Sequence, residues 1–411
     1  MSSVTDKLAF LHALSLRFHF TVSFMVANSF SWYVVLFTFF YQTVNDLLAS
    51  GVITYSQWLA IFSIHYLGTI CFAVLGVIFF RGKRNTLLAL WMLLGSASSI
   101  LLVLINGTFL SSLLSSLFLG CAIGVGLPAC FAYFADSTIV ENRGVASGIT
   151  WGFSGFLILA LALGLGNLNT LFERALALAV WRGLGFVSFS LTRRVEEQKQ
   201  RIPTLRSIFS ERTLILYLVS WVMFSLVNWI EIPMIQKTLG ESLYIYVFIV
   251  EYGITALFAV PAGLACDRIG RKPVIITGFV ILGIEYSLLS IFPEMQFTQY
   301  LYIAVDGIVW GIFASVFFMI IWGDLAHDKR KERYYLVGEL PYLLGSYLSV
   351  ILGPTIALIP PIAAFSIASF FLFVAVLPLL YAPETLPEKR LKDRELKGYV
   401  EKAKKTRGKY T

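Results

Sequence analysis

The sequence is poor in charged residues and in the residues that build metal and hydrolytic active sites. Charged side chains make up 14% of its 411 residues, whereas about a quarter is usual for a soluble domain. It has four histidines and four cysteines, and the cysteines lie in apolar stretches without metal-ligand spacing. The hydrolase patterns H-E-x-x-H and G-x-S-x-G do not occur. We therefore exclude a soluble domain, and we expect no metal, no cofactor and no enzyme activity.

What the sequence does contain is long apolar runs. Hydrophobic residues make up 58% of the chain and gather in segments of about 20 residues, the length that crosses a bilayer as a helix. We predict an all-α membrane protein with twelve transmembrane helices. The predicted helices are 20–42, 55–80, 86–105, 110–133, 144–165 and 174–191 in the first half, and 213–235, 243–265, 274–291, 300–322, 335–358 and 363–380 in the second.

A polar linker at residues 193–212 divides the predicted helices six and six. The predicted domains are therefore an N-terminal half (1–192), this linker, a C-terminal half (213–382) and a basic tail (383–411). The linker is either a solvated connection or a short amphipathic helix on the membrane surface.

The basic residues lie on one side of this arrangement. They concentrate at 81–84, 193–212, 268–272 and 329–333 and in the tail, whereas the other side has only Arg174 and Lys237. Such asymmetry predicts a multi-pass protein of the cytoplasmic membrane with both termini in the cytoplasm. The formal net charge of +8 is then a topology signal, and we expect no nucleic acid partner.

One loop has a distinctive sequence: residues 263–273 read GLACDRIGRKP. It resembles the G-x-x-x-D-R-x-G-R-K signature of the major facilitator superfamily, which lies between the second and third helices of a six-helix half. Residues 76–84 resemble a second copy that keeps the first glycine and the bases but has Phe80 in place of the acid. The resemblance implies two pseudo-symmetric six-helix bundles that give alternating access to a central site.

The resemblance also implies a cytoplasmic gate in the second half. Its implied residues are Gly263, Asp267, Arg268, Gly270, Arg271 and Asp324. We expect Asp267 to lie at the start of the eleventh helix and Arg271 to lie beside Asp324, as exposed ion pairs worth at most ~1 kcal/mol. Because Phe80 replaces the acid, we expect no comparable contact in the first half. The glycines at 144, 148, 152 and 155 predict a tight helix contact.

Ionisable residues inside apolar segments are costly and are therefore functional candidates. Helical spacing puts Tyr302, Asp306 and Trp310 on one face. The resemblance implies a central site with substrate-binding candidates Asn28, Tyr33, Asn228, Tyr302, Asp306 and Trp310, and proton-coupling candidates Asp306, Glu251 and Glu231. For Glu231 a hydrated position at the mouth of the site is the alternative. We expect structural contacts for His65, Arg182 and Glu285, and hydration from the cytoplasm for Glu339.

The deep charges favour coupling to protons. Four deep acids face only one deep base, Arg182, and an unpaired buried carboxylate avoids the desolvation cost by binding a proton. We predict a secondary active transporter for a small organic solute, with efflux of amphipathic or cationic compounds as one interpretation. Residues 383–385, Pro-Glu-Thr, favour the alternative of a sugar-like symporter or facilitator. Sodium in place of the proton and a polytopic membrane enzyme also remain open. The expected partners are the solute, the coupling ion and lipid, and we expect a monomer.

Overall fold

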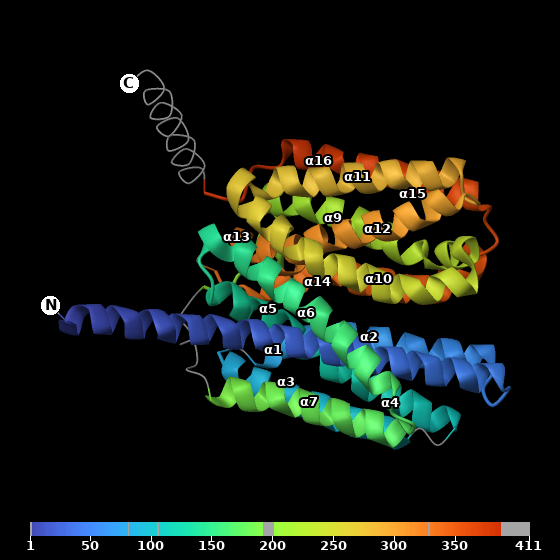
Figure 1. The fold of residues 1–411 in the computed structure, drawn as a ribbon, viewed down its shortest axis with the longest axis horizontal. Helices are drawn as coiled ribbons and strands as arrows, with labels where there is room; N and C mark the ends of the chain where they lie inside the picture. Colours follow the sequence, from blue (N-terminus) through green and yellow to red (C-terminus); the bar gives the residue numbers. More distant parts are fainter. Residues whose placement is uncertain (1, 81, 105–106, 192–200, 328, 388–411) are drawn as a thin grey trace.

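The structure is a computed structural model that describes residues 2–80, 82–104, 107–191, 201–327 and 329–387. These residues are almost entirely helical (Figure 1). The first half contains α1 (Ser2–Ala49), α2 (Tyr55–Phe79), α3 (Arg84–Leu101), the turn η1 (Leu102–Leu104), α4 (Phe109–Gly124), α5 (Leu127–Asp136), the turn η2 (Val140–Asn142), α6 (Arg143–Gly166) and α7 (Leu171–Leu191).

The second half follows the short helix α8 (Leu205–Phe209), which lies in the predicted linker. Its elements are α9 (Arg212–Ile230), α10 (Ile232–Ile269), α11 (Arg271–Ile291), α12 (Gln296–Phe313), the π-helical segment η3 (Ala314–Ile320), α13 (Ile321–Leu325), α14 (Glu332–Ile356), α15 (Pro361–Val374) and α16 (Val376–Tyr381). All twelve predicted segments fall on helices.

Several helix boundaries follow directly from local sequence. Thr54 begins α2 with a capping box, in which its hydroxyl accepts from the Gln57 N–H and the Gln57 side chain accepts from the Thr54 N–H. The predicted helix 110–133 is divided into α4 and α5 just before Pro128, because proline has no N–H to continue the hydrogen-bond ladder. In α10 the bend lies at Gly240, whose φ of 70° favours glycine.

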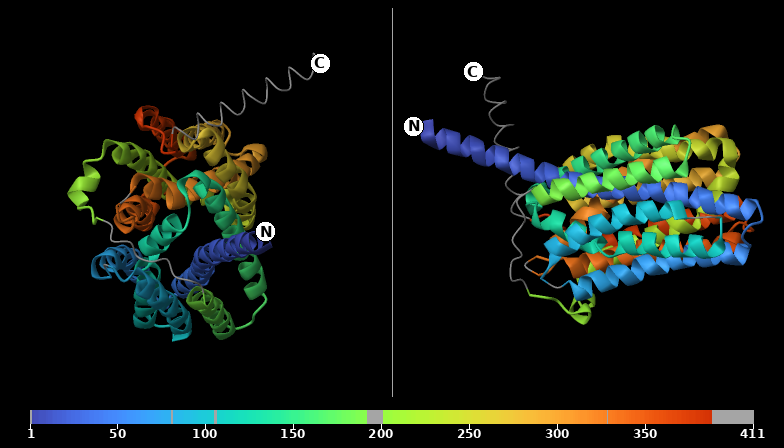
Figure 2. Two further views of the ribbon diagram at one scale, coloured as in Figure 1. Left: turned by 90° about the vertical axis from the view of Figure 1, so that its left-hand side faces the viewer. Right: turned by 90° about the horizontal axis from the view of Figure 1, so that it is seen from below.

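Eleven segments of the described chain are long and apolar enough to cross a membrane, which makes this a multi-pass membrane protein. The third predicted segment, α3, is the one outside this set, and it begins with the polar pair Arg84 and Asn85. In Figures 1 and 2 the helices run side by side along one long axis, with the first half on one side and the second half on the other.

We call the end of the bundle that carries residues 263–273 the signature end. The two halves meet most extensively along α6 and α10, and also along α2 and α14. A Cβ atom added to Gly263 would lie 2.1 Å from the Gly144 carbonyl oxygen, and one on Gly148 would lie 2.4 Å from the Ala259 carbonyl oxygen. The predicted tight glycine contact is therefore confirmed, and it lies between the halves. We call it the glycine seam.

Candidate functional site

Two acids of the second half lie close together where α10 packs against α12. Thr255 Oγ1 donates to the Gly307 carbonyl oxygen at 3.1 Å, and a Cβ on Gly307 would lie 3.1 Å from the Glu251 carbonyl oxygen. Asp306, next to Gly307, is 5% exposed and lies within electrostatic range of Glu251. Neither acid has an ion-pair partner within the described ranges.

Glu231 and Tyr302 lie in the same region as Asp306 and Glu251. The Tyr302 ring packs against Tyr286 of α11 at a centroid distance of 5.7 Å, and Tyr286 lies within electrostatic range of Asp306, Glu231 and Glu251. Glu231 is buried between α9 and α10, and its Oε2 has no hydrogen-bond partner among the residues described. The three predicted proton-coupling acids are thus gathered in the second half.

An aromatic residue that the sequence analysis missed, Tyr342 of α14, lies beside this acid region. Its ring is 5.8 Å from Trp310 and 5.1 Å from Trp229, which follows the partly exposed Asn228. Tyr342 lies within electrostatic range of Glu251 and also of Tyr33 in the first half. The signal in the sequence was a proline, Pro341, in a tyrosine-rich apolar segment.

In the first half, His65 forms hydrogen bonds that fix the position of the Tyr33 side chain. The Tyr33 hydroxyl is 2.9 Å from His65 Nε2, and His65 Nδ1 is 3.3 Å from the Ser116 carbonyl oxygen. A carbonyl oxygen only accepts, so Nδ1 carries the proton and Nε2 accepts from the Tyr33 hydroxyl. His65 is fully buried and hydrogen-bonded, as expected for a structural contact.

Asn28 does not face the acids. Its Nδ2 donates to the Trp181 carbonyl oxygen at 2.7 Å, and its Oδ1 accepts from Arg182 Nη1 at 3.2 Å. Arg182 is fully buried between the rings of Trp32 and Trp91, at 5.0 and 4.4 Å. Arg182 therefore makes the structural contact we expected, and Asn28 belongs to that contact inside the first half.

Glu339 corrects one expectation. It is not hydrated, because its side chain is only 2% exposed and both carboxyl oxygens are buried without a hydrogen-bond partner among the described residues. Glu285 is also buried, and its Oε1 has no partner within the same ranges.

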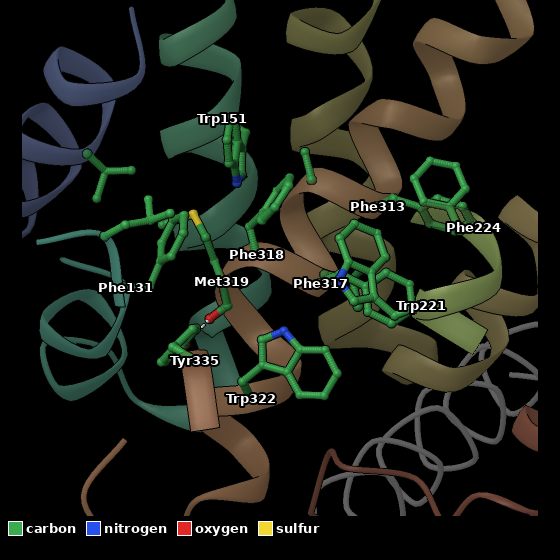
Figure 3. Packing of buried hydrophobic residues seen from close by; sticks show 14 of the residues in the cluster. Phe131, Trp151, Trp221, Phe224, Phe313, Phe317, Phe318, Met319, Trp322 and Tyr335 are labelled. Atoms are coloured by element: carbon green, nitrogen blue, oxygen red, sulfur yellow. Dashed lines mark hydrogen bonds between the residues drawn. The ribbon is translucent and has the colours of Figure 1, made fainter. Parts of the chain in front are cut away.

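A layer of aromatic rings connects the halves (Figure 3). Its centre is Phe318 of η3, whose ring is 5.6 Å from Trp151 and 6.1 Å from Phe131 of the first half. Within the second half the same ring is 5.5 Å from Trp221. The Tyr335 hydroxyl donates to the Met319 carbonyl oxygen at 2.6 Å, which satisfies a backbone group of the π-helical segment.

At the signature end, Asp267 corrects a second expectation. Its carboxylate accepts from the Gly144 and Val145 N–H groups at 2.9 and 2.8 Å, so it caps α6 and not the eleventh helix, α14. The reason is the pseudo-symmetry of the halves, in which the second-half signature faces the fifth helix of the first half. The cap is favourable because the N–H groups at a helix start attract an anion.

The expected contact between Arg271 and Asp324 is present. Arg271 Nε lies 3.3 Å from Asp324 Oδ2, and Arg271 Nη1 lies 2.9 Å from Asp267 Oδ1. Arg143 of the first half also bonds to Asp324. The side chains of Arg271 and Asp324 are 0% exposed, so the expectation of exposed ion pairs is wrong and the contacts are buried.

Arg268 and Gly270 take no direct part in this network. Arg268 is exposed, and Gly270 has a φ of 105° at the junction of α10 and α11. The start of α11 is capped by Glu384, whose carboxylate accepts from the N–H groups of Arg271 and Lys272 at 2.9 and 3.0 Å. Glu384 is a member of the signature end that the sequence analysis did not assign to it.

The first half does have ion pairs of its own, contrary to expectation. Arg84 Nη1 lies 2.5 Å from Asp136 Oδ2, and Lys331 of the second half also bonds to Asp136. Arg84 and Asp136 occupy the positions that Arg271 and Asp324 hold in the other half, so only the acid replaced by Phe80 is missing. Lys331, which precedes α14, does not cap that helix with its side chain.

Comparison with known proteins agrees with this architecture. The family model of the Major Facilitator Superfamily matches residues 213–407, and no curated protein matches the chain significantly. A solved structure of the proton:xylose symporter XylE bound to 6-bromo-6-deoxy-D-glucose aligns with a TM-score of 0.71 and 13% identity over 91% of this chain and 97% of that chain. A solved structure of a double-tryptophan mutant of XylE aligns with a TM-score of 0.73 and 15% identity, over 94% of this chain and 99% of that chain.

The human organic anion transporter MFSD10 aligns with a TM-score of 0.61 and 14% identity, over 89% of this chain and 99% of that chain. At these identities the likeness shows the fold alone. Residues 213–407 match the family model, and the chain as a whole has the fold of the major facilitator superfamily.

Proposed function

We propose that this protein is a secondary active transporter that moves a small organic solute across the cytoplasmic membrane by alternating access, driven by protons. The observation that carries the proposal is the pair of Asp306, which is buried, and Glu251, which is partly buried, without an ion-pair partner among the described residues. Two carboxylates this close do not both ionise readily, because burial and mutual repulsion penalise the charged forms. The pair therefore holds either a proton or a cationic solute.

The surroundings of the pair favour an amphipathic or cationic solute. Trp310 and Tyr342 provide an aromatic wall beside Glu251, and aromatic faces attract organic cations. A cation that enters would displace the proton, which gives exchange of protons for solute and hence efflux. Tyr33, Asn228 and Tyr302 complete the proposed binding site.

A second candidate is symport of a neutral, sugar-like solute. It is favoured by the likeness to a proton:xylose symporter. In that case the proton stays on the acid pair while the solute is bound, and both move together.

We further propose that the contacts of Asp267, Arg271 and Asp324 with the first half form the gate, and that Gly263 allows the gate to close. The bases at this end support a cytoplasmic position for it. In this conformation the halves are joined at the gate, so the central site is closed toward the cytoplasm.

The test is flux in proteoliposomes, with solutes chosen by a thermal-shift screen. We expect the wild type to accumulate its solute in response to a pH gradient. Asp306→Asn should lose at least nine-tenths of that accumulation, because an amide cannot exchange a proton, while solute exchange without a gradient continues. Glu294→Gln, which changes an exposed acid, is the control.

Three outcomes would contradict parts of the proposal. Full accumulation by Asp306→Asn with the pH dependence of the wild type would exclude Asp306 as the coupling residue. Accumulation driven by sodium alone would replace the proton as coupling ion. A wild type that only equilibrates its solute would be a facilitator.

A further inference from the structure

We propose that Glu339 is a second proton-binding residue, through which protons leave the acid pair toward the signature end. This inference rests on the proposed proton-coupled transport. It assigns a role to a buried carboxyl group that neither the central site nor the gate uses.

The geometry around Glu339 is that of a neutral carboxyl group. The side chain is 2% exposed, and neither carboxyl oxygen has a hydrogen-bond partner within the described chain. An ionised carboxylate in such a place is strongly disfavoured, because it loses its water and receives no donor in return. Glu339 therefore holds a proton while the halves are closed at the signature end.

The neighbours of Glu339 do not offer it a charge partner. Tyr335, one turn earlier, uses its hydroxyl to bond Met319, and Cys130 of α5 is a weak donor. Arg143 already bonds to Asp324 and to the Ala135 carbonyl oxygen. The titratable and charged groups on the elements packed against α14 include His65 and Tyr66 of α2, Cys130, Tyr133 and Asp136 of α5, Arg212 and Tyr217 of α9, Glu251, Tyr252, Asp267 and Arg268 of α10, and Asp324 of α13. The segment η3 has none.

Glu339 lies between the region of the acid pair and the signature end, where the two halves separate. Tyr342 lies three residues further along α14, on the same side of the helix, and within electrostatic range of Glu251. In the other direction, Glu339 lies where α14 meets α5 of the opposite half, a contact that separates when the halves rock apart. Opening therefore brings water to Glu339.

In each transport cycle Glu339 releases one proton and takes up one proton. When the signature end opens, Glu339 gives its proton to water and becomes a carboxylate. When the end closes, the carboxylate loses its water and takes the proton that Glu251 gives up. Glu251 is then free to bind a proton from the opposite end.

The experiment compares two isosteric variants of buried acids, Glu339→Gln and the peripheral control Glu285→Gln, in the full-length protein. Because the amide resembles the neutral acid, we expect both variants to fold. In proteoliposomes Glu339→Gln should exchange solute but accumulate less than a tenth of the wild-type amount under a pH gradient. Glu339→Asp should restore most of the accumulation, and Glu285→Gln should behave as the wild type.

A second measurement does not depend on transport. Infrared spectra of purified protein at neutral pH should show a carboxylic-acid C=O stretch that decreases in Glu339→Gln. Wild-type accumulation by Glu339→Gln, or an unchanged infrared band, would overturn the inference. If the wild type itself does not accumulate solute, the proposed function fails, and the infrared band alone decides whether Glu339 holds a proton.

Discussion

At the scale of single residues, the signature end is held by buried charges that bond to backbone as well as to each other. Asp267 accepts two N–H groups from α6 and one bond from Arg271. Arg271 in turn bonds to Asp324 and to the carbonyl oxygens of Cys266 and Val140. Buried contacts of this kind contribute more than exposed ion pairs, because removing one partner leaves the others without compensation.

We predict that Asp267→Asn weakens the closed signature end without unfolding the protein. The amide keeps one acceptor oxygen but loses the charge that pairs with Arg271. The expected cost is about 1–3 kcal/mol, a shift of roughly 5- to 150-fold toward the open conformation. The measurement is the labelling rate of a cysteine at Ser147, which is fully buried between the halves, in a background without native cysteines.

Glu294→Gln is the control for Asp267→Asn, because Glu294 is exposed and far from the signature. We expect slower transport and an unchanged melting temperature for Asp267→Asn. Unchanged labelling together with unchanged transport would show that Asp267 has no part in the gate.

The sequence was sufficient to find most charged residues of the signature end but not all of their contacts. The pairing of Arg271 with Asp324 was predicted, since both belong to recognisable loops of one half. The cap on α6 by Asp267 and the burial of Glu339 were not, because they depend on which helices of the opposite half lie against them. Nothing in a single sequence records that choice.

At the scale of elements, the glycine seam is a close backbone contact between the halves. We predict that Gly148→Ala disfavours this conformation, because the added methyl group would lie 2.4 Å from the Ala259 carbonyl oxygen. Overpacking of this kind costs about 1–3 kcal/mol. A cysteine at Ser315, buried opposite Ser147, should label faster in the variant.

Gly164→Ala is a matched control for this substitution. It lies in the same helix, and a Cβ there would have no atom within 4 Å. Equal labelling rates in the two variants would mean that the seam does not limit how closely the halves approach.

Some elements departed from the predicted continuous helices. The break between α4 and α5 has a visible cause in Pro128. The π-helical segment η3 does not, because residues 314–320 contain neither glycine nor proline. Its conformation accompanies the packing of Phe318 against rings of both halves, and π-helical turns commonly mark functional positions. Such packing is a tertiary property that helix periodicity cannot reveal.

At the scale of the whole molecule, the membrane-spanning segments were predictable because apolar length is a local property, whereas the division of the chain at residues 193–212 stays a prediction. The positions of the two ends relative to the membrane remain a prediction. Single cysteines at Ser210 and Ser50, both exposed and at opposite ends of the bundle, should label from the cytoplasm and from outside, respectively. Labelling of both from one side would contradict the topology.

The glycine seam also limits how this protein can change during evolution. Replacing Gly263 by alanine would place the added methyl group 2.1 Å from the Gly144 carbonyl oxygen. A backbone atom cannot avoid this clash by changing rotamer, as a side chain can. Selection therefore has no small step available there: the residue stays as it is or the contact is lost. By contrast, the first-half copy of the signature has phenylalanine at position 80, where the second-half copy has its acid.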